Sequence, residues 1–185
     1  SDLAMHAVRR ELLQAQAEAT GLPLHVVPLP WPCSNEQYEA IMKRAVEGFV
    51  ADGFTHAAFG DLFLEDVRRY REERLAGSGL QPLFPIWKTK STAALAQDMV
   101  DAGLRATLTG VNPKQLDRSF AGRTFDRDLL RDLPAGVDPC GENGEFHSFA
   151  HAGPMFRRSI PVQLGEIVDR DGFIFADLVS PQSEG

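Results

Sequence analysis

The alternation of amphipathic helices with short apolar runs is the feature that most constrains how this 185-residue chain can fold. Apolar side chains recur every three or four positions over 4–19, 35–52 and 92–103, and a glycine follows each stretch closely. This pattern predicts three helices. Between and after them, short apolar runs that predict strands occupy 24–29, 55–60 and 104–111. The succession favours an α/β domain with a parallel sheet.

Local signals mark where single elements begin and end. Ser34 and Gln37 form a capping-box pattern at the start of the helix over 35–52. A highly charged stretch over 64–79 predicts another helix, which its glycines end.

The composition changes after about residue 111. Gly, Pro and Asp become frequent, which predicts a long loop with one short helix near 126–132. Three strands are then predicted, over 144–153, 159–170 and 172–179, and Asp171-Gly172 predicts a tight hairpin between the last two. We therefore divide the chain into an α/β domain over 1–111 and a smaller α+β part over 112–185.

Charge and composition exclude several classes of protein. Lys and Arg number 19 against 26 Asp and Glu, so the net charge is −7, which argues against a nucleic-acid binder. No apolar run approaches the roughly 18 residues that a membrane span needs, and the N-terminus lacks the layout of a signal peptide. Cys33 and Cys140 give no disulfide framework, which favours a reducing, cytoplasmic location.

Gly60 and Asp61 follow the predicted strand over 55–60. In open α/β sheets ligands bind outside the carboxyl ends of the strands, so Asp61 is a candidate for holding magnesium or a ribose. The alternative is that Asp61 caps a helix that starts near Leu64.

In the charged helix that follows, Arg68 and Arg71 share a face where an anion can bind. The alternative is a solvated, salt-bridged face, which spacings such as Glu65–Arg69 also support.

The loop 138–149, with the sequence DPCGENGEFHSF, is the strongest local signal. Gly141 and Gly144 permit positive φ, and five chemically versatile side chains lie beside them: Cys140, Glu142, Asn143, Glu145 and His147. Such a loop can bind a substrate amine or anion, or supply a general acid and base. The alternative is a tight turn whose acidic side chains are merely exposed.

Histidines in the following strand allow a different chemistry. His147 and His151 are four residues apart on one predicted strand face, and Cys140 with His147 forms a weak candidate for a thiol nucleophile. A hydrolase centred on these three side chains is therefore a further alternative.

Three segments together carry a family resemblance: FGDLFLEDVRRYREERLAGSGLQPLFPIW, AGLRATLTGVNPKQLDRSFAGRTFD and DLPAGVDPCGENGEFHSFAHAGPMF. Over roughly 5–178 the chain resembles the diphthamide-synthase-type ATP-binding family of the PP-loop ATP pyrophosphatases. The resemblance implies an adenine-nucleotide hydrolase-like, Rossmann-like parallel sheet with nucleotide binding in 1–111 and substrate binding in 112–185. It also implies that ATP adenylates a carboxylate and that ammonia then displaces AMP to give an amide.

The resemblance assigns roles to individual residues, with ATP and magnesium as cofactors. The nucleotide-binding group is Gly60, Asp61, Arg68 and Arg71, with Asp61 also a magnesium ligand. The substrate-binding group is Glu65, Cys140, Gly141, Asn143 and Gly144. The catalytic group is Glu142, Glu145 and His147, of which His147 departs from the family pattern and is included for its acid–base chemistry.

Two departures from the family pattern change the expected function. The family's first strand and its phosphate-binding SGGKDS loop do not occur in these 185 residues, so we expect about 40 further residues that carry them. If the loop is truly lost, the alternative is a nucleotide- or metabolite-binding protein without catalysis. The loop reads CGENGEFHSF where diphthine ligases resemble CGEGGEYETF, which is similar to a bacterial branch and implies a small bacterial metabolite as the carboxylate substrate.

The C-terminal hairpin leaves the oligomeric state open. It is compatible with pairing across a homodimer and equally with an internal sheet.

Overall fold

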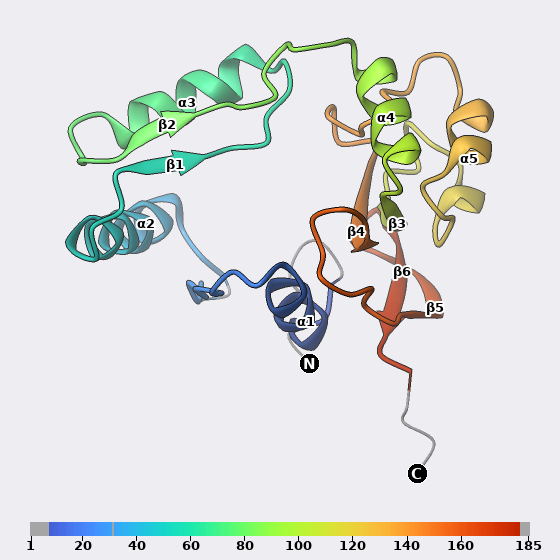
Figure 1. Cartoon of the computed structure of the whole chain (residues 1–185), viewed down its shortest axis with the longest axis horizontal. Coiled ribbons are helices and arrows are strands. Elements are labelled where there is room, and N and C mark those ends of the chain that lie inside the picture. Colours follow the sequence, from blue (N-terminus) through green and yellow to red (C-terminus); the bar gives the residue numbers. More distant parts are fainter. Residues whose placement is uncertain (1–7, 31, 182–185) are drawn as a thin grey trace. The chain divides into compact units, whose positions relative to one another are not determined.

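The computed structural model describes residues 8–30 and 32–181. The chain forms two compact units. Figure 1 labels their helices and strands. The larger unit takes its described residues from 8–24 and 91–181, and the smaller unit takes them from 25–30 and 32–90. These packing units have other boundaries than the division at residue 111, which rests on composition and on expected binding roles and stays a prediction.

The smaller unit is a two-stranded parallel sheet with two helices. Its elements are α2 (Asn35–Ala51), β1 (His56–Ala58), α3 (Glu65–Leu75) and β2 (Gln81–Leu83). The predicted capping box is confirmed, since Ser34 Oγ accepts the Gln37 backbone N–H at 3.2 Å and Gln37 Oε1 accepts the Ser34 N–H at 3.0 Å.

Two strand predictions in this unit need correction. No strand forms over 22–30, because Pro23, Pro28 and Pro30 each lack the N–H that a sheet ladder needs. β1 is shorter than the predicted 55–60 and is not buried, since His56 and Ala58 are exposed. Within the described residues β1 pairs with β2 alone, so nothing in this sheet covers its other edge.

The larger unit is a four-stranded antiparallel sheet with helices. Its helices are α1 (Arg10–Thr20), α4 (Thr92–Asp101), the 3₁₀ turn η1 (Arg118–Phe120) and α5 (Arg127–Asp132). Its strands are β3 (Arg105–Val111), β4 (Phe146–Ala152), β5 (Gln163–Arg170) and β6 (Phe173–Val179), in the order β4-β3-β6-β5. The start predicted for the first helix, at residue 4, lies outside the described residues.

The direction of β3 differs from the prediction. We expected it in the parallel sheet, but it pairs antiparallel with both β4 and β6. Six of its seven residues are buried. A continuous buried run of this kind fits a central strand in a parallel or in an antiparallel sheet. The fold is therefore mixed α/β, and the expected parallel arrangement is confirmed only for β1 and β2.

Two apolar clusters form the core of the larger unit. One joins α4 and α5 to the sheet, through residues such as Ala96, Leu129, Leu108, Phe146 and Ile174. The other packs α1 on β4 and β6, through Leu12, Ala19, Phe149, Ile160 and Leu178. None of the described helices is long and apolar enough to cross a membrane.

Candidate functional site

A buried carboxylate organises the loop between α5 and β4. Glu145 is only 2% exposed. Its Oε1 accepts the Asp138 backbone N–H at 2.9 Å and the Asn143 Nδ2 at 3.1 Å, and its Oε2 accepts the Asn143 N–H at 3.0 Å. Glu145 therefore ties the start and the middle of the predicted substrate loop, Asp138 and Asn143, to one buried carboxylate.

A second carboxylate and a glycine tighten the same loop. Asp138 is 9% exposed and accepts the Glu142 backbone N–H at 2.9 Å. Gly141 has φ of 70°, and a Cβ on it would lie 2.8 Å from the Phe146 carbonyl oxygen. Only glycine fits there, so the loop holds the backbone of Glu142 in a fixed place.

This geometry predicts different costs for two glycine substitutions. Gly144 also has positive φ, of 79°, but a Cβ on it would meet no heavy atom within 4 Å. We expect Gly144→Ala to lower the free energy of unfolding by about 1–2 kcal/mol, the cost of left-handed backbone. Gly141→Ala adds a backbone clash and should cost clearly more. Urea denaturation of the two variants tests this, and equal losses would contradict it.

Cys140 lies in the loop as a protonated thiol. Its Sγ donates to the Thr92 carbonyl oxygen at 3.4 Å. Burial, and next the charges of Asp138 and Glu142, raise the pKa of Cys140 to about 12. Because the thiolate is the nucleophilic form, the alternative of a Cys–His hydrolase has no support in this geometry.

The raised pKa of Cys140 predicts its reactivity. In a Cys33→Ser variant, which leaves Cys140 as the one cysteine, alkylation by iodoacetamide should be slow at pH 7. The rate should rise about tenfold per pH unit up to pH 10 without levelling off, because the thiolate fraction follows the pKa. A plateau reached near pH 8, measured by mass spectrometry, would contradict this prediction.

The two histidines of β4 lie beside irregularities in its pairing with β3. The register shifts between Leu108 and Gly110, opposite His147, and again between Arg105 and Ala106, where His151 is the extra residue on β4. Burial, and then the charge of Arg105, lower the pKa of His151, whose Nε2 lies 3.3 Å from Thr107 Oγ1.

The sequence analysis missed a second loop at this site, directly after β3. The Asn112 backbone N–H donates to the Glu145 carbonyl at 2.9 Å, and Asn112 Nδ2 donates to Gln115 Oε1 at 2.6 Å. Gln115 Nε2 in turn lies 3.5 Å from the Asn143 carbonyl oxygen. The sequence signal that could have identified this loop is the turn Asn112-Pro113-Lys114-Gln115 at the end of a buried strand. Asn side chains stabilise such turns by accepting a backbone N–H two residues on, as Asn112 Oδ1 does from Lys114.

In the smaller unit, Asp61 is paired with Arg71. Arg71 Nε and Nη2 lie 3.0 and 3.4 Å from the two carboxylate oxygens, and the Asp61 side chain is 14% exposed. The alternative role of Asp61 as a helix cap is wrong, because Leu64 is the N-cap of α3 and no side chain caps it. Gly60, which precedes Asp61, is exposed.

Cations and aromatic rings cluster where β1 and β2 end. The Arg68 guanidinium lies 4.8 Å from the Phe84 ring centre and 5.0 Å from that of Trp87, and Arg71 lies 4.7 Å from the Phe59 ring. Arg68 Nε also donates to Glu72 at 2.8 Å. We call Arg68, Arg71, Phe59, Phe84 and Trp87 the arginine–aromatic cluster. Glu65, predicted with the substrate loop, lies in this unit instead and pairs with Lys88.

The C-terminal part of the chain matches a known family. Residues 91–176 match the model of the diphthamide synthase C-terminal domain, and the match begins where the long segment of the larger unit begins. The chain is 31% identical over 182 residues to the diphthine–ammonia ligase of Danio rerio, covering 86% of this chain and 68% of that protein. The chain belongs to the diphthine–ammonia ligase family.

Two other members of the family also align with this chain. The diphthine–ammonia ligase of Bos taurus is 27% identical, over 91% of this chain and 68% of that protein. The one of Homo sapiens is 31% identical, over 78% of this chain and 55% of that protein. The family resemblance predicted from the sequence is thus confirmed, while the assignment to a bacterial branch stays a prediction.

The described residues of this family member do not form a metal site of their own. No group of three or more His, Cys, Asp or Glu in this part of the chain could hold a metal ion. Asp61, the predicted magnesium ligand, has both carboxylate oxygens directed at Arg71. The role of Asp61 as a magnesium ligand therefore stays a prediction, and we derive no chemical step through magnesium.

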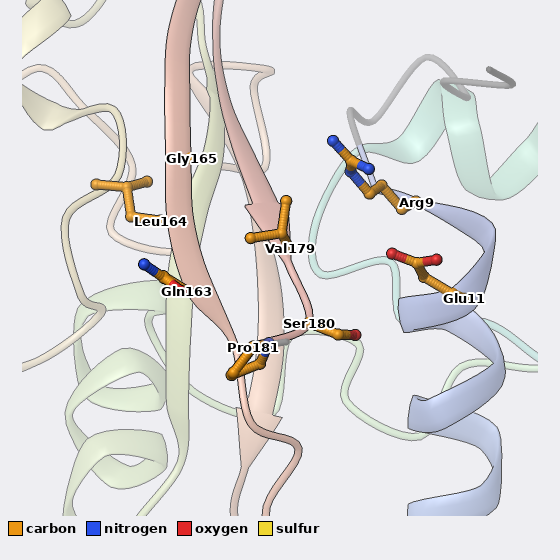
Figure 2. A pocket seen from close by; sticks show the side chains of 8 residues that line it. All are labelled: Arg9, Glu11, Gln163, Leu164, Gly165, Val179, Ser180 and Pro181. Atoms are coloured by element: carbon orange, nitrogen blue, oxygen red, sulfur yellow. The ribbon is translucent and has the colours of Figure 1, made fainter. Parts of the chain in front are cut away.

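An open groove lies elsewhere in the larger unit, between the start of α1 and the strands β5 and β6 (Figure 2). Its lining is Arg9, Glu11, Gln163, Leu164, Gly165, Val179, Ser180 and Pro181. Arg9 is bound to Asp177 by two hydrogen bonds of 2.6 and 3.1 Å. None of the predicted site residues lines this groove.

Proposed function

We propose that this chain is part of an ATP-dependent ligase that joins ammonia to a carboxylate to form an amide. The observation that carries the proposal is the alignment with proteins named diphthine–ammonia ligase, which extends over 86% of the chain. In the proposed reaction, a carboxylate oxygen attacks the α-phosphorus of ATP and pyrophosphate leaves. Ammonia then attacks the acyl carbon, the C–O bond to AMP breaks, and the nitrogen gives up a proton.

The substrate loop supplies the groups for the second step. We propose that the Glu142 carboxylate binds ammonia and takes up its proton, and that His147, five residues further on in β4, assists it. The hydrogen bond from the Glu142 backbone to Asp138 supports this role, because it fixes where the Glu142 side chain begins. Glu145, which was predicted as catalytic, is better suited to positioning, since its oxygens already accept three hydrogen bonds.

The arginine–aromatic cluster supplies groups for an anion in the smaller unit. Guanidinium groups stacked on rings lose little further freedom when they bind a phosphate or carboxylate. We propose that Arg68 contacts such an anion and that Asp61 holds Arg71 in the orientation in which it does the same. Gly60 is exposed and has no side chain, so the proposed anion can approach the backbone there.

The substrate is proposed to be a small bacterial carboxylate. The support is the loop sequence Glu142-Asn143-Gly144-Glu145-Phe146-His147, which departs from the diphthine ligase pattern. We keep one alternative, a nucleotide- or metabolite-binding protein without catalysis.

The test is an assay of ammonia-dependent AMP release on the full reading frame that encodes this chain. The protein is incubated with ATP, ammonium chloride and a panel of small carboxylates, and AMP and pyrophosphate are quantified by chromatography. With at least one carboxylate, we expect AMP and pyrophosphate to form in equal amounts over many turnovers. Without ammonia, the reaction should stop after a single turnover. ATP binding by calorimetry without AMP from any carboxylate in the panel would favour the binding protein. No nucleotide binding at all would overturn the proposal.

A further inference from the structure

β5 is a free edge of the antiparallel sheet in the larger unit. It pairs with β6 on one side, and no other described strand pairs with its second side (Figure 1). All eight of its residues are exposed, and the apolar Leu164, Ile167 and Val168 are 46%, 37% and 39% exposed. An exposed strand edge with apolar side chains is a template for pairing with another strand.

The hairpin turn decides which backbone groups of β5 point outward. Asp171 and Gly172, with φ of 54° and 80°, form a two-residue turn, which makes Arg170 and Phe173 a hydrogen-bonded pair. Hydrogen-bonded and non-hydrogen-bonded pairs alternate in antiparallel ladders. Since the register from 167 to 170 is regular, Ile167 and Asp169 direct their N–H and C=O groups away from β6.

These outward groups allow two copies to pair in a register centred on Val168. If Ile167 of each copy faces Asp169 of the other, both residues of each pair can exchange backbone hydrogen bonds. Val168 then faces Val168 at the two-fold axis, and Glu166, the residue just before the regular stretch of β5, comes opposite Arg170 on each side of it. Pairs of opposite charge across strands are stabilising, so the charges of β5 complement themselves in a register that the backbone allows.

Neighbouring registers are poorer. Centring the pair on Asp169 places two carboxylates opposite each other, which is destabilising. Centring it on Ile167 places Glu166 opposite Val168 and Arg170 opposite Leu164, so neither charge meets an opposite charge. Among the registers that the backbone alternation allows, the charge pattern therefore selects the one centred on Val168.

We propose that β5 is the interface of a two-fold homodimer in which the sheets of two copies join edge to edge with Val168 on the axis. The inference does not depend on the proposed function. Arg118 Nη2 donates to the Ile167 carbonyl at 3.3 Å, but a carbonyl oxygen has two lone pairs and can accept a second bond. The same residues of β5 form both sides of this interface, as two-fold symmetry requires.

The experiment is a charge reversal measured by analytical ultracentrifugation over a range of protein concentrations. The wild-type protein encoded by the full reading frame should sediment as a dimer that dissociates on dilution. Glu166→Arg or Arg170→Glu alone should shift the midpoint of dissociation to at least about tenfold higher concentration, because each places like charges opposite each other twice. The double variant, with both Glu166→Arg and Arg170→Glu, should restore most of the affinity between the two copies. Lys43→Glu, an exposed change on α2 that alters the charge as Arg170→Glu does, is the control.

A backbone variant makes the test independent of charge. Asp169→Pro removes one outward N–H and leaves the pairing with β6 intact, since proline is tolerated at a sheet edge. It should abolish the dimer while the thermal unfolding transition is retained. A wild-type protein that is monomeric at all concentrations would overturn the proposal. So would a dimer that the single charge reversals and Asp169→Pro leave unchanged.

Discussion

Replacing Glu145 by alanine should lower the free energy of unfolding by about 3 kcal/mol or more. The change leaves three hydrogen-bond donors without their acceptor: the backbone N–H groups of Asp138 and Asn143 and the Asn143 side-chain amide. The Asp138 N–H is buried and costs about 1–3 kcal/mol when it loses its partner, and the two part-buried Asn143 donors each add a smaller amount. Urea denaturation followed by circular dichroism measures the loss.

Two variants separate this effect from a general effect of removing charge. Glu145→Gln keeps one oxygen acceptor and should lose about 1–3 kcal/mol, because its new amide faces one of the former donors. Glu47→Ala, an exposed change on α2, should stay within about 0.5 kcal/mol of the wild type. If Glu145→Ala were as mild as Glu47→Ala, the carboxylate would not hold the loop together.

Glu142→Gln should lower kcat for amide formation by about 10²–10⁴-fold, which is the usual loss when a general base is removed. Glutamine has nearly the same shape but cannot take a proton from the attacking nitrogen. The backbone bond to Asp138 is kept, so the loop should stay in place. Ammonia-dependent AMP release under saturating ATP measures the loss.

The stability of the two variants distinguishes chemistry from folding. Glu142→Gln should leave the unfolding transition and the affinity for ATP unchanged, whereas Glu145→Gln should weaken stability and activity together. A kcat within about threefold of the wild type for Glu142→Gln would remove Glu142 from the proton transfer.

The elements that the sequence predicted well are those whose signals are local. The capping box of Ser34 and Gln37 forms as expected, and the hairpin at Asp171-Gly172 forms with positive φ at both positions. Caps and tight turns depend on the backbone geometry of three or four consecutive residues, so the residues concerned are next to each other in the sequence.

The residues of the candidate site were predicted, but their burial and their bonding partners were not. The loop 138–149 was identified from its glycines and acids, and Asp61 and Arg71 were both singled out. That Glu145 is buried and bonded within the loop, and that Asp61 pairs with Arg71 ten residues away, depends on how the chain folds back on itself. A carboxylate near glycines looks the same in the sequence whether it faces solvent or backbone donors.

The sequence by itself determined the family, the helices and the turns of this protein. The tertiary structure decided that β3 pairs antiparallel with β4 and β6, that no strand forms over 22–30, and that β5 is left as an edge. The physical reason is the range of the interactions. A cap or a turn is stabilised by neighbours in the sequence, whereas a strand or a buried carboxylate is stabilised by partners that only the folded chain brings together.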